Sequence, residues 1–342
     1  MICTGVNMHL KSMLTLLATG LLVSSNVLSQ EVNIYSYRQP HLIEPVLSRF
    51  TEQTGIKTNV VYAKEGITER LKREGRNSPA DIVLTTEIGL LLELVENDLV
   101  QPIQSPLVTT HVPANYRAED GKWVGLTLRA RSIYASKERQ VAKDLNYEDL
   151  ADPRFKGKVC TRPGKHPYNI GLIASMIASK GEAETLKWLQ GVKDNLARKP
   201  QGNDREQVKA IKEGLCDVSL GNSYYLGAML SEPSERAWAE AVNIVFPNQS
   251  NRGTHVNASG VAMTRYAPHP DTALKLVEFL TDTEAQKIYA EVNFEYPVKP
   301  GVPSSALVSS WGEFKRDNLS LPEMAKYRAA AARLVDKVDF DG

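Results

Sequence analysis

Hydrophobic and polar positions follow two periods along this chain, and the two alternate. Short apolar or β-branched runs are typical of buried strands, and they occupy 32–35, 57–62, 80–85, 123–134, 215–220, 243–246 and 256–263. Apolar residues three or four positions apart are typical of amphipathic helices, and they occupy 43–54, 66–74, 88–97, 170–179, 182–191, 204–213, 270–280 and 284–292. The alanine-rich stretch 323–338 predicts one long helix on the outside of the fold. This order of strands and helices predicts an α/β protein with a parallel sheet covered on both faces.

The first 29 residues have the pattern of an export signal. Lys11 precedes an apolar run over 13–23, and Ser29 supplies a small residue ahead of a cleavage site before Gln30 or Glu31. The apolar run is shorter than the roughly 20 residues that a membrane span requires. We therefore expect 1–29 to be a signal peptide and the mature protein to be exported and soluble. In a Gram-negative bacterium this location is the periplasm.

Charge and length restrict the class of protein further. Lys11 is the only Lys, Arg, Asp or Glu of 1–29, so the mature chain carries 40 basic and 40 acidic residues. A neutral chain lacks the basic footprint of proteins that bind nucleic acid or anionic membranes, and we predict neither partner. The mature chain of about 310 residues exceeds what one hydrophobic core holds, which predicts two lobes.

Two cysteines remain after the signal, Cys160 and Cys216, each at the end of a predicted strand. An even number of cysteines in an exported chain favours a disulfide. The alternative is a nucleophilic thiol at Cys160 with His166 as its base, which would make the protein an exported cysteine hydrolase. The sequence contains no Gly-x-Ser-x-Gly, His-Glu-x-x-His or phosphate-binding loop, and this argues against an enzyme.

Two adjacent tyrosines, Tyr224 and Tyr225, follow a predicted strand and a Gly-Asn-Ser turn. Asn222 or Ser223 is a favourable N-cap, which predicts that both tyrosines lie in the first turn of a helix. Ligands of open α/β sheets bind at such boundaries between strand and helix. Two phenol oxygens in one cleft suit a small, hard, highly charged cation. The structural alternative is that one tyrosine packs in the core and the other lies on the surface.

Five motifs follow one another along the mature chain. They are Tyr35-Ser36-Tyr37-Arg38-Gln39-Pro40, Ala80-Asp81-Ile82-Val83, Trp123-Val124-Gly125-Leu126-Thr127-Leu128-Arg129-Ala130-Arg131, Phe155-Lys156-Gly157-Lys158-Val159-Cys160 and Asn222-Ser223-Tyr224-Tyr225. In this order they resemble the periplasmic ferric-iron-binding proteins of bacterial ABC importers. The resemblance extends over essentially the whole mature chain, and the ordered set is more specific than any single motif.

The resemblance implies the class II fold of periplasmic binding proteins. In this fold each of two α/β lobes has a mixed, mainly parallel sheet flanked by helices, and two strands form the hinge between the lobes. The first lobe would comprise 30–130 plus about 257–342, and the second lobe 131–256. The lobes would close on Fe³⁺, and the protein, a monomer without enzymatic activity, would deliver the ion to an inner-membrane ABC permease.

By the same resemblance, Tyr224 and Tyr225 are metal ligands, and Tyr168 in the segment 162–169 is the third. Fe³⁺ is a hard acid and prefers anionic oxygen donors. A bound cation displaces the proton of a phenol, whose ordinary pKa is about 10. Iron affinity should therefore fall at low pH without any redox step. The structural alternative for Tyr168 is a packed side chain.

The first lobe departs from many of these relatives, which carry His and Tyr where this chain has Gln39 and Pro40. The departure implies that a synergistic anion, carbonate or bicarbonate, completes the coordination shell. Arg38 and Arg129 would hold the anion through paired hydrogen bonds, and Gln39 would donate one more. A salt bridge is the alternative role for either arginine.

Three other residues near these positions are weaker candidates. Tyr37 and His41 flank the first-lobe site out of register with the family's ligands, and Arg131 shares a strand with Arg129.

Two rival functions stay open. One is a binding protein of the same fold for a polyamine, phosphonate or sugar, and the other is the hydrolase based on Cys160 and His166. The remaining histidines, His111, His255 and His269, stand in loop contexts, and we expect them on the surface.

Overall fold

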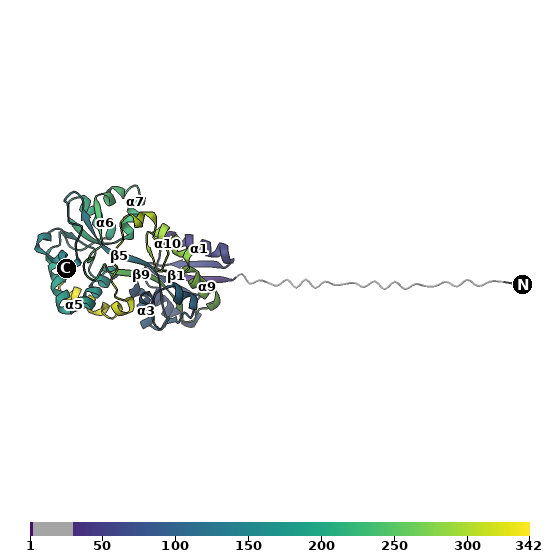
Figure 1. The fold of residues 1–342 in the computed structure, drawn as a ribbon. Helices are drawn as coiled ribbons and strands as arrows, with labels where there is room; N and C mark the ends of the chain where they lie inside the picture. The colour runs from purple at the N-terminus through teal and green to yellow at the C-terminus, as the bar shows by residue number, and fades with distance from the viewer. Residues whose placement is uncertain (3–29) are drawn as a thin grey trace.

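The computed structural model describes residues 1–2 and 30–342, so the predicted signal peptide lies almost entirely outside the described residues. Figure 1 shows two α/β bodies joined near the strands β5 (Val124–Ser136) and β9 (Val256–Thr264). The predicted two-lobed α/β fold is confirmed. None of the helices in the described part of the chain combines the length and the apolar character needed to cross a membrane.

The first lobe is built on three parallel strands. β1 (Glu31–Ser36) pairs with β2 (Lys57–Tyr62) on one side and with β3 (Ile82–Thr85) on the other. All four residues of β3 are buried, as expected of a strand covered on both faces. The lobe also contains the short strand β4 (Val100–Gln101) and the helices α1 (Pro40–Thr54), α2 (Ile67–Glu74), α3 (Ile88–Glu96), α4 (Pro106–His111), α9 (Pro270–Leu280) and α10 (Thr283–Asn293).

The hinge strand β5 belongs to the sheets of both lobes, and all of its residues are buried. In the first lobe it pairs with β9 and with β10 (Tyr296–Pro297); in the second lobe it pairs with β7 (Val218–Asn222) and β8 (Val242–Val245). Each of these pairings is antiparallel. The sheets are therefore mixed, as predicted, but the expectation of mainly parallel sheets is wrong, because the strands that join the lobes run against their neighbours.

In the second lobe, two helices begin close after short strands. β6 (Val159–Cys160) lies parallel to β7, and α7 (Tyr224–Ser231) follows β7 directly. The helices predicted at 170–179 and 182–191 form one element, α5 (Pro167–Asp194), interrupted at Gly181, whose φ of 81° lies in the left-handed region. The other helices are α6 (Asp204–Lys212) and α8 (Arg236–Glu240), with 3₁₀ turns at Tyr147–Ala151 and Pro153–Phe155.

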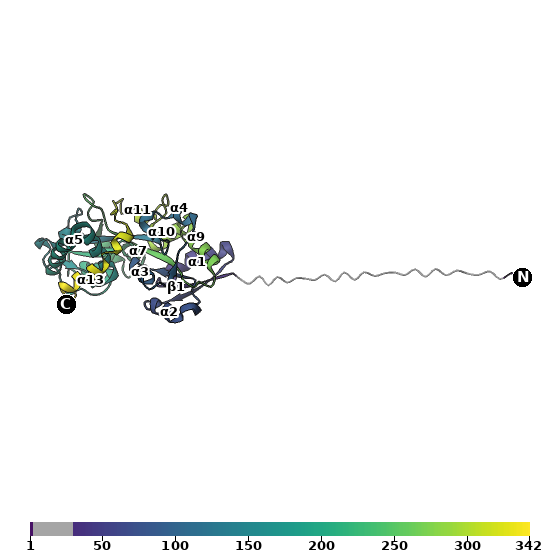
Figure 2. The same cartoon turned by 90° about the horizontal axis from the view of Figure 1, so that it is seen from below.

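The C-terminal segment returns to the second lobe. After α11 (Ala306–Ser309), the backbone of 315–317 hydrogen-bonds to Thr254, and two helices follow, α12 (Leu321–Ala325) and α13 (Arg328–Lys337). The single helix predicted over 323–338 is wrong, since the chain turns at 326–327 between the two. α13 packs on α5, and the carboxylate of Asp341 accepts bonds from the amides of Gly164 and Lys165. α13 thus packs on the second lobe (Figure 2), although the sequence assigned 257–342 to the first, while its first residue, Arg328, also forms a salt bridge with Glu87 of the first lobe.

The predicted disulfide is confirmed. Cys160 and Cys216 are bonded, with their Cα atoms 5.9 Å apart and 56 residues apart in sequence. In the chain-entropy account, closing such a loop contributes about 4 kcal/mol to stability. The bond also removes the thiol that the hydrolase alternative requires, because a disulfide sulfur at Cys160 is no longer a nucleophile.

His255 is buried at the hinge, with 3% of its surface exposed, so the expectation that it lies on the surface is wrong. Burial, with Arg252 as the next cause, lowers the pKa of His255 to about 3. Its Nε2 atom has no hydrogen-bond partner. The folded protein therefore holds this imidazole neutral at pH values where an unfolded chain would protonate it.

This buried histidine predicts a loss of stability in mild acid. The folded pKa lies below the unfolded value of about 6.5, so below that pH the unfolded chain binds the extra proton and is favoured. The free energy of unfolding should fall by about 1.4 kcal/mol per pH unit on this account. Urea denaturation at several pH values measures the free energy of unfolding as a function of pH. This free energy should fall less steeply with decreasing pH in His255→Gln than in wild type. The exposed His41→Gln serves as control, and equal slopes for His255→Gln and wild type would contradict the assignment.

Candidate functional site

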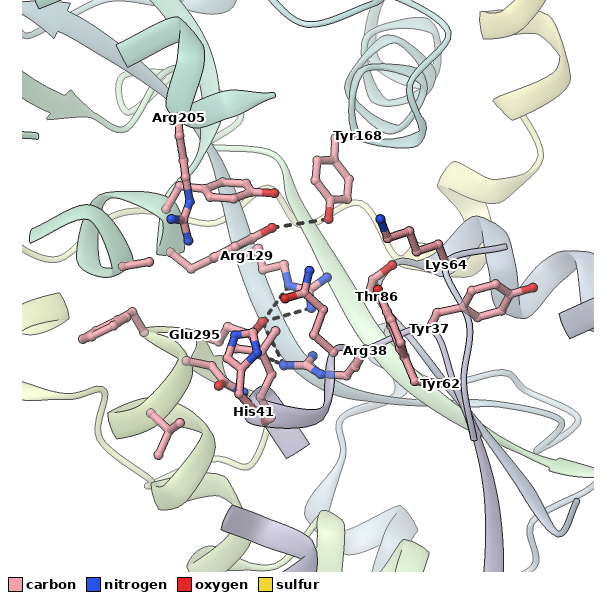
Figure 3. Close-up of a pocket in the computed structure, with 18 of the residues that line it drawn as sticks. Tyr37, Arg38, His41, Tyr62, Lys64, Thr86, Arg129, Tyr168, Arg205 and Glu295 are labelled. Atoms are coloured by element: carbon pink, nitrogen blue, oxygen red, sulfur yellow. Dashed lines mark hydrogen bonds and ion pairs between the residues drawn. The ribbon is translucent and has the colours of Figure 1, made fainter. Parts of the chain in front are cut away.

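A cleft of about 570 Å³ lies between the two lobes, and all of the site residues predicted from the sequence except Arg131 line it. The first lobe and hinge contribute Tyr37, Arg38, Gln39, His41 and Arg129, and the second lobe contributes Tyr168, Tyr224 and Tyr225. Figure 3 shows Tyr168 of the second lobe with its hydroxyl directed into this cleft, toward the region that holds Arg38 and Arg129. Residues more than 180 positions apart in sequence thus line one cleft. Arg129 lies at its base because β5, which contains it, runs from one lobe to the other.

The three tyrosines come together at two helix beginnings. Tyr224 and Tyr225 are the first residues of α7, as predicted, and Tyr168 is the second residue of α5. The Oη atoms of Tyr168 and Tyr224 lie 3.3 Å apart, and the ring centroids of Tyr224 and Tyr225 lie 4.2 Å apart. His166 caps α5 by accepting the amide hydrogen of Tyr168 on its Nδ1 atom. Ser223 takes a helical φ and makes no side-chain cap, so the expected N-cap bond is absent.

Burial makes these phenols reluctant to ionise by themselves. It raises the pKa of Tyr224 well above its ordinary value, and the neighbouring Tyr168 and Tyr225 add to the effect. It also raises the pKa of Tyr225 to about 12. The guanidinium of Arg129 lies 5.4 Å from the ring centroid of Tyr224 and acts in the opposite direction. At neutral pH Tyr224 and Tyr225 therefore stay protonated in the absence of a cation that stabilises the phenolates.

The donor set of this cluster is distinctive within the molecule. Over the described residues, His, Cys, Asp and Glu side chains form no group of three or more that suits a metal ion. Once deprotonated, the three neighbouring phenol oxygens are hard, anionic donors. They suit a hard trivalent ion better than a soft metal ion. Phenols are also poor ligands for Ca²⁺ and Mg²⁺, which proteins bind through carboxylate and carbonyl oxygens.

Arg38 and Arg129 both form salt bridges with Glu295, a residue that the sequence analysis did not identify. Nη2 of Arg38 lies 3.1 Å from Oε2 of Glu295, and Nη2 of Arg129 lies 2.9 Å from Oε1. The salt-bridge role considered for each arginine is therefore confirmed, and the salt bridges use only part of each guanidinium. Nε and Nη1 of Arg38 and Nη1 of Arg129 are buried without a hydrogen-bond partner.

The weaker first-lobe candidates line the cleft without joining the tyrosine cluster. The hydroxyl of Tyr37 points away from Tyr168 in Figure 3. Burial raises the pKa of Tyr37, and the nearby Thr68 at the start of α2 opposes the shift. Gln39 and His41 are both exposed, and both line the cleft.

Arg131 lies beneath the tyrosines instead of lining the cleft. Its Nη1 atom donates to Oδ2 of Asp204 at 2.8 Å, and its Nη2 atom donates to Oδ1 of Asn169 at 2.7 Å. The amide of Asn222 also donates to Asp204 at 2.9 Å. Asn169 follows Tyr168, and Asn222 precedes the tyrosine pair by two residues. This buried network therefore connects Arg131 to the two chain segments that carry the three phenols, and Arg131 does not line the cleft.

The cleft also has a positively charged rim that the sequence did not predict. Arg162, Arg205 and Lys64 line it, and Arg162 lies 5.0 Å from the ring centroid of Tyr168. Figure 3 shows Lys64 of the first lobe extending toward Tyr168. These residues follow no local pattern, although Arg162 stands in the same segment as Tyr168. His166 also faces the cleft, and burial lowers its pKa to about 3, with Arg162 as the next cause.

The chain is similar to known proteins over most of its length. The chain matches the family described as bacterial extracellular solute-binding protein over residues 77–313. It is 43% identical over 315 residues to iron uptake protein A1 of Synechocystis sp., covering 91% of this chain and 88% of that protein. Ferric iron-binding protein A of Mannheimia haemolytica, solved in an open conformation, is 51% identical with a TM-score of 0.88, covering 92% of this chain and 99% of its own. A Trichodesmium protein solved with iron and citrate ligands is 39% identical with a TM-score of 0.87, covering 91% and 99%.

Proposed function

The chain belongs to the bacterial extracellular solute-binding protein family, and we propose that it captures Fe³⁺ in the cleft between its lobes and delivers it to an inner-membrane ABC permease. The iron uptake and ferric iron-binding names of its relatives support this function. The observation that carries the proposal is the approach of Tyr168, Tyr224 and Tyr225 at one end of the cleft. The protein would act in the periplasm as a monomer.

The proposed coordination uses all three phenols as oxyanions. Because burial raises the pKa values of Tyr224 and Tyr225, each phenol releases a proton when iron binds. Three negative charges then balance one trivalent ion. The affinity for Fe³⁺ should fall by up to about tenfold per pH unit for each proton displaced. This linkage gives capture at neutral pH and weaker binding in acid without reduction of the metal.

The remaining coordination sites would be filled by a synergistic anion, carbonate or bicarbonate. Arg38, Gln39 and Arg129 would hold it, since all three line the cleft and each arginine keeps buried N–H groups without a hydrogen-bond partner. The positive rim formed by Lys64, Arg162 and Arg205 favours an anion over a cationic solute such as a polyamine. Glu295 is the only carboxylate among the described residues that line the cleft, and it is already paired with two arginines.

A titration of purified, iron-free protein with ferric citrate tests this function. We expect an orange-red colour from charge transfer between phenolate and iron, saturating at one iron per chain, and release of protons into a weakly buffered solution. A colourless mixture that shows no heat of binding with iron would contradict the proposal. Retention of a phosphonate or sugar instead would favour a binding protein of the same fold for another solute.

A further inference from the structure

We infer that Glu295 is a positioning and specificity-determining residue of the anion site, one that orients Arg38 and Arg129 and limits the charge of the anion that they accept. This inference rests on the proposed function. The carboxylate is 3% exposed and accepts hydrogen bonds from three residues. They are Arg38, Arg129 through both Nε and Nη2 at 3.0 and 2.9 Å, and Thr127 through Oγ1 at 2.6 Å.

The backbone around Glu295 fixes its direction. Phe294 ends α10 with a φ of 56°, a left-handed conformation that turns the chain sharply. β10 then pairs with β5, so that Tyr296 lies opposite Leu128 and Pro297 opposite Thr127. The preceding residue, Glu295, is therefore held beside the arginine side chains of the hinge by sheet pairing.

The same segment touches the helix that carries the tyrosines. A Cβ atom placed on Gly227 in α7 would lie only 2.4 Å from the ring of Phe294, so glycine permits the two to pack closely. Figure 3 shows Glu295 on the same side of the cleft as Arg38 and Arg129, with both of which it pairs, and Tyr168 on the opposite side. Glu295 thus lies where the first lobe, the hinge and the tyrosine helix meet.

Glu295 uses only part of each guanidinium. It takes Nη2 of Arg38 and the Nε–Nη2 edge of Arg129, while Nε and Nη1 of Arg38 and Nη1 of Arg129 have no partner. An arginine that is bonded on one edge loses rotamer freedom, so its other donors are pre-organised for a planar oxyanion. An arginine without this anchor would have to be ordered by the anion itself.

Glu295 also sets the local charge. Two arginines and one carboxylate carry a single net positive charge, and the proposed iron–phenolate unit is neutral. The arginine pair therefore matches a singly charged anion such as bicarbonate. Without the carboxylate the pair would carry two positive charges and would favour a doubly charged anion such as hydrogen phosphate.

The test compares bicarbonate with inorganic phosphate in wild type, Glu295→Gln and Glu295→Asp. For Glu295→Gln we expect the preference for phosphate over bicarbonate, measured from the affinity of each iron–anion–protein complex, to rise about tenfold. Glu295→Asp keeps the charge but is too short to reach both arginines. It should weaken the binding of both anions and leave their ratio unchanged. The exposed Glu291→Gln, in α10 four residues before Glu295, changes the net charge equally and should behave as wild type.

An unchanged phosphate-to-bicarbonate ratio in folded Glu295→Gln would overturn the inference. Should that variant not fold, Glu295→Asp decides, because wild-type affinity for both anions in Glu295→Asp would also overturn it. Calorimetric titration of the iron-free proteins with phosphate separates this inference from the proposed function. Phosphate binding that depends on Glu295, in a protein that gives no colour with iron, would contradict the iron-binding function alone.

Discussion

Tyr225→Phe is expected to lower the affinity for Fe³⁺ by about 100-fold or more, which corresponds to about 3 kcal/mol of binding free energy. The substitution removes a single oxygen and keeps the ring that packs against Tyr224 with a centroid distance of 4.2 Å. A hard trivalent ion has no good substitute for a lost anionic oxygen except water. The colour should weaken in parallel, since one of three charge-transfer partners is gone.

The matched control for this substitution is Tyr37→Phe. Tyr37 lines the same cleft, but its hydroxyl points away from Tyr168 toward α2. We expect iron affinity close to that of wild type, as measured by competition with a chelator of known strength. Equal losses in the two variants would show that the first lobe supplies a ligand, and no loss in Tyr225→Phe would contradict the proposed ligand set.

Asp204→Asn is expected to destabilise the protein by about 3 to 5 kcal/mol, the largest effect on stability that we predict. Asp204 is fully buried and pairs with Arg131 at 2.8 Å and with Arg162 at 3.3 Å. Burial alone would raise the pKa of Asp204, but the charges of Arg131 and Arg162 hold it below its ordinary value. Loss of the carboxylate charge would leave two arginines without their counter-charge in a dry environment.

Urea denaturation of the iron-free protein measures this loss. The exposed Asp194→Asn at the end of α5 is the control, and its effect should stay within about 0.5 kcal/mol. We also expect folded Asp204→Asn to bind iron less tightly, because Asp204 and Arg131 fix the segments that carry the three tyrosines. A variant as stable as wild type would show that the buried network does not support the site.

Much of the fold and of the site could be predicted from local sequence patterns. The tyrosine pair stands at a boundary between strand and helix, and the position of Tyr168 followed from its resemblance to the family. The structure places all three at one end of the cleft. Local periodicity also predicted most strands and helices of the first lobe, since their apolar faces are regular.

The features that sequence reasoning missed depend on contacts between distant segments. Glu295 meets Arg38 across 257 residues, and no spacing rule links the two. The antiparallel pairing of β5 and the packing of α13 on α5 likewise follow from how the lobes are joined and not from local periodicity. His255 had the sequence context of a loop, yet it immediately precedes β9 and is buried at the hinge. Arg129 could be placed on a predicted strand, but its salt-bridge partner Glu295 could not be identified without the fold.

The central claim is that three phenolates of the second lobe bind one ferric ion. The most direct test is a crystal structure of the iron-loaded protein with anomalous data collected at the iron absorption edge. We predict a single anomalous peak in the cleft, within bonding distance of the Oη atoms of Tyr168, Tyr224 and Tyr225. A peak bound elsewhere, or a peak in the cleft that one of these three oxygens does not reach, would contradict the account.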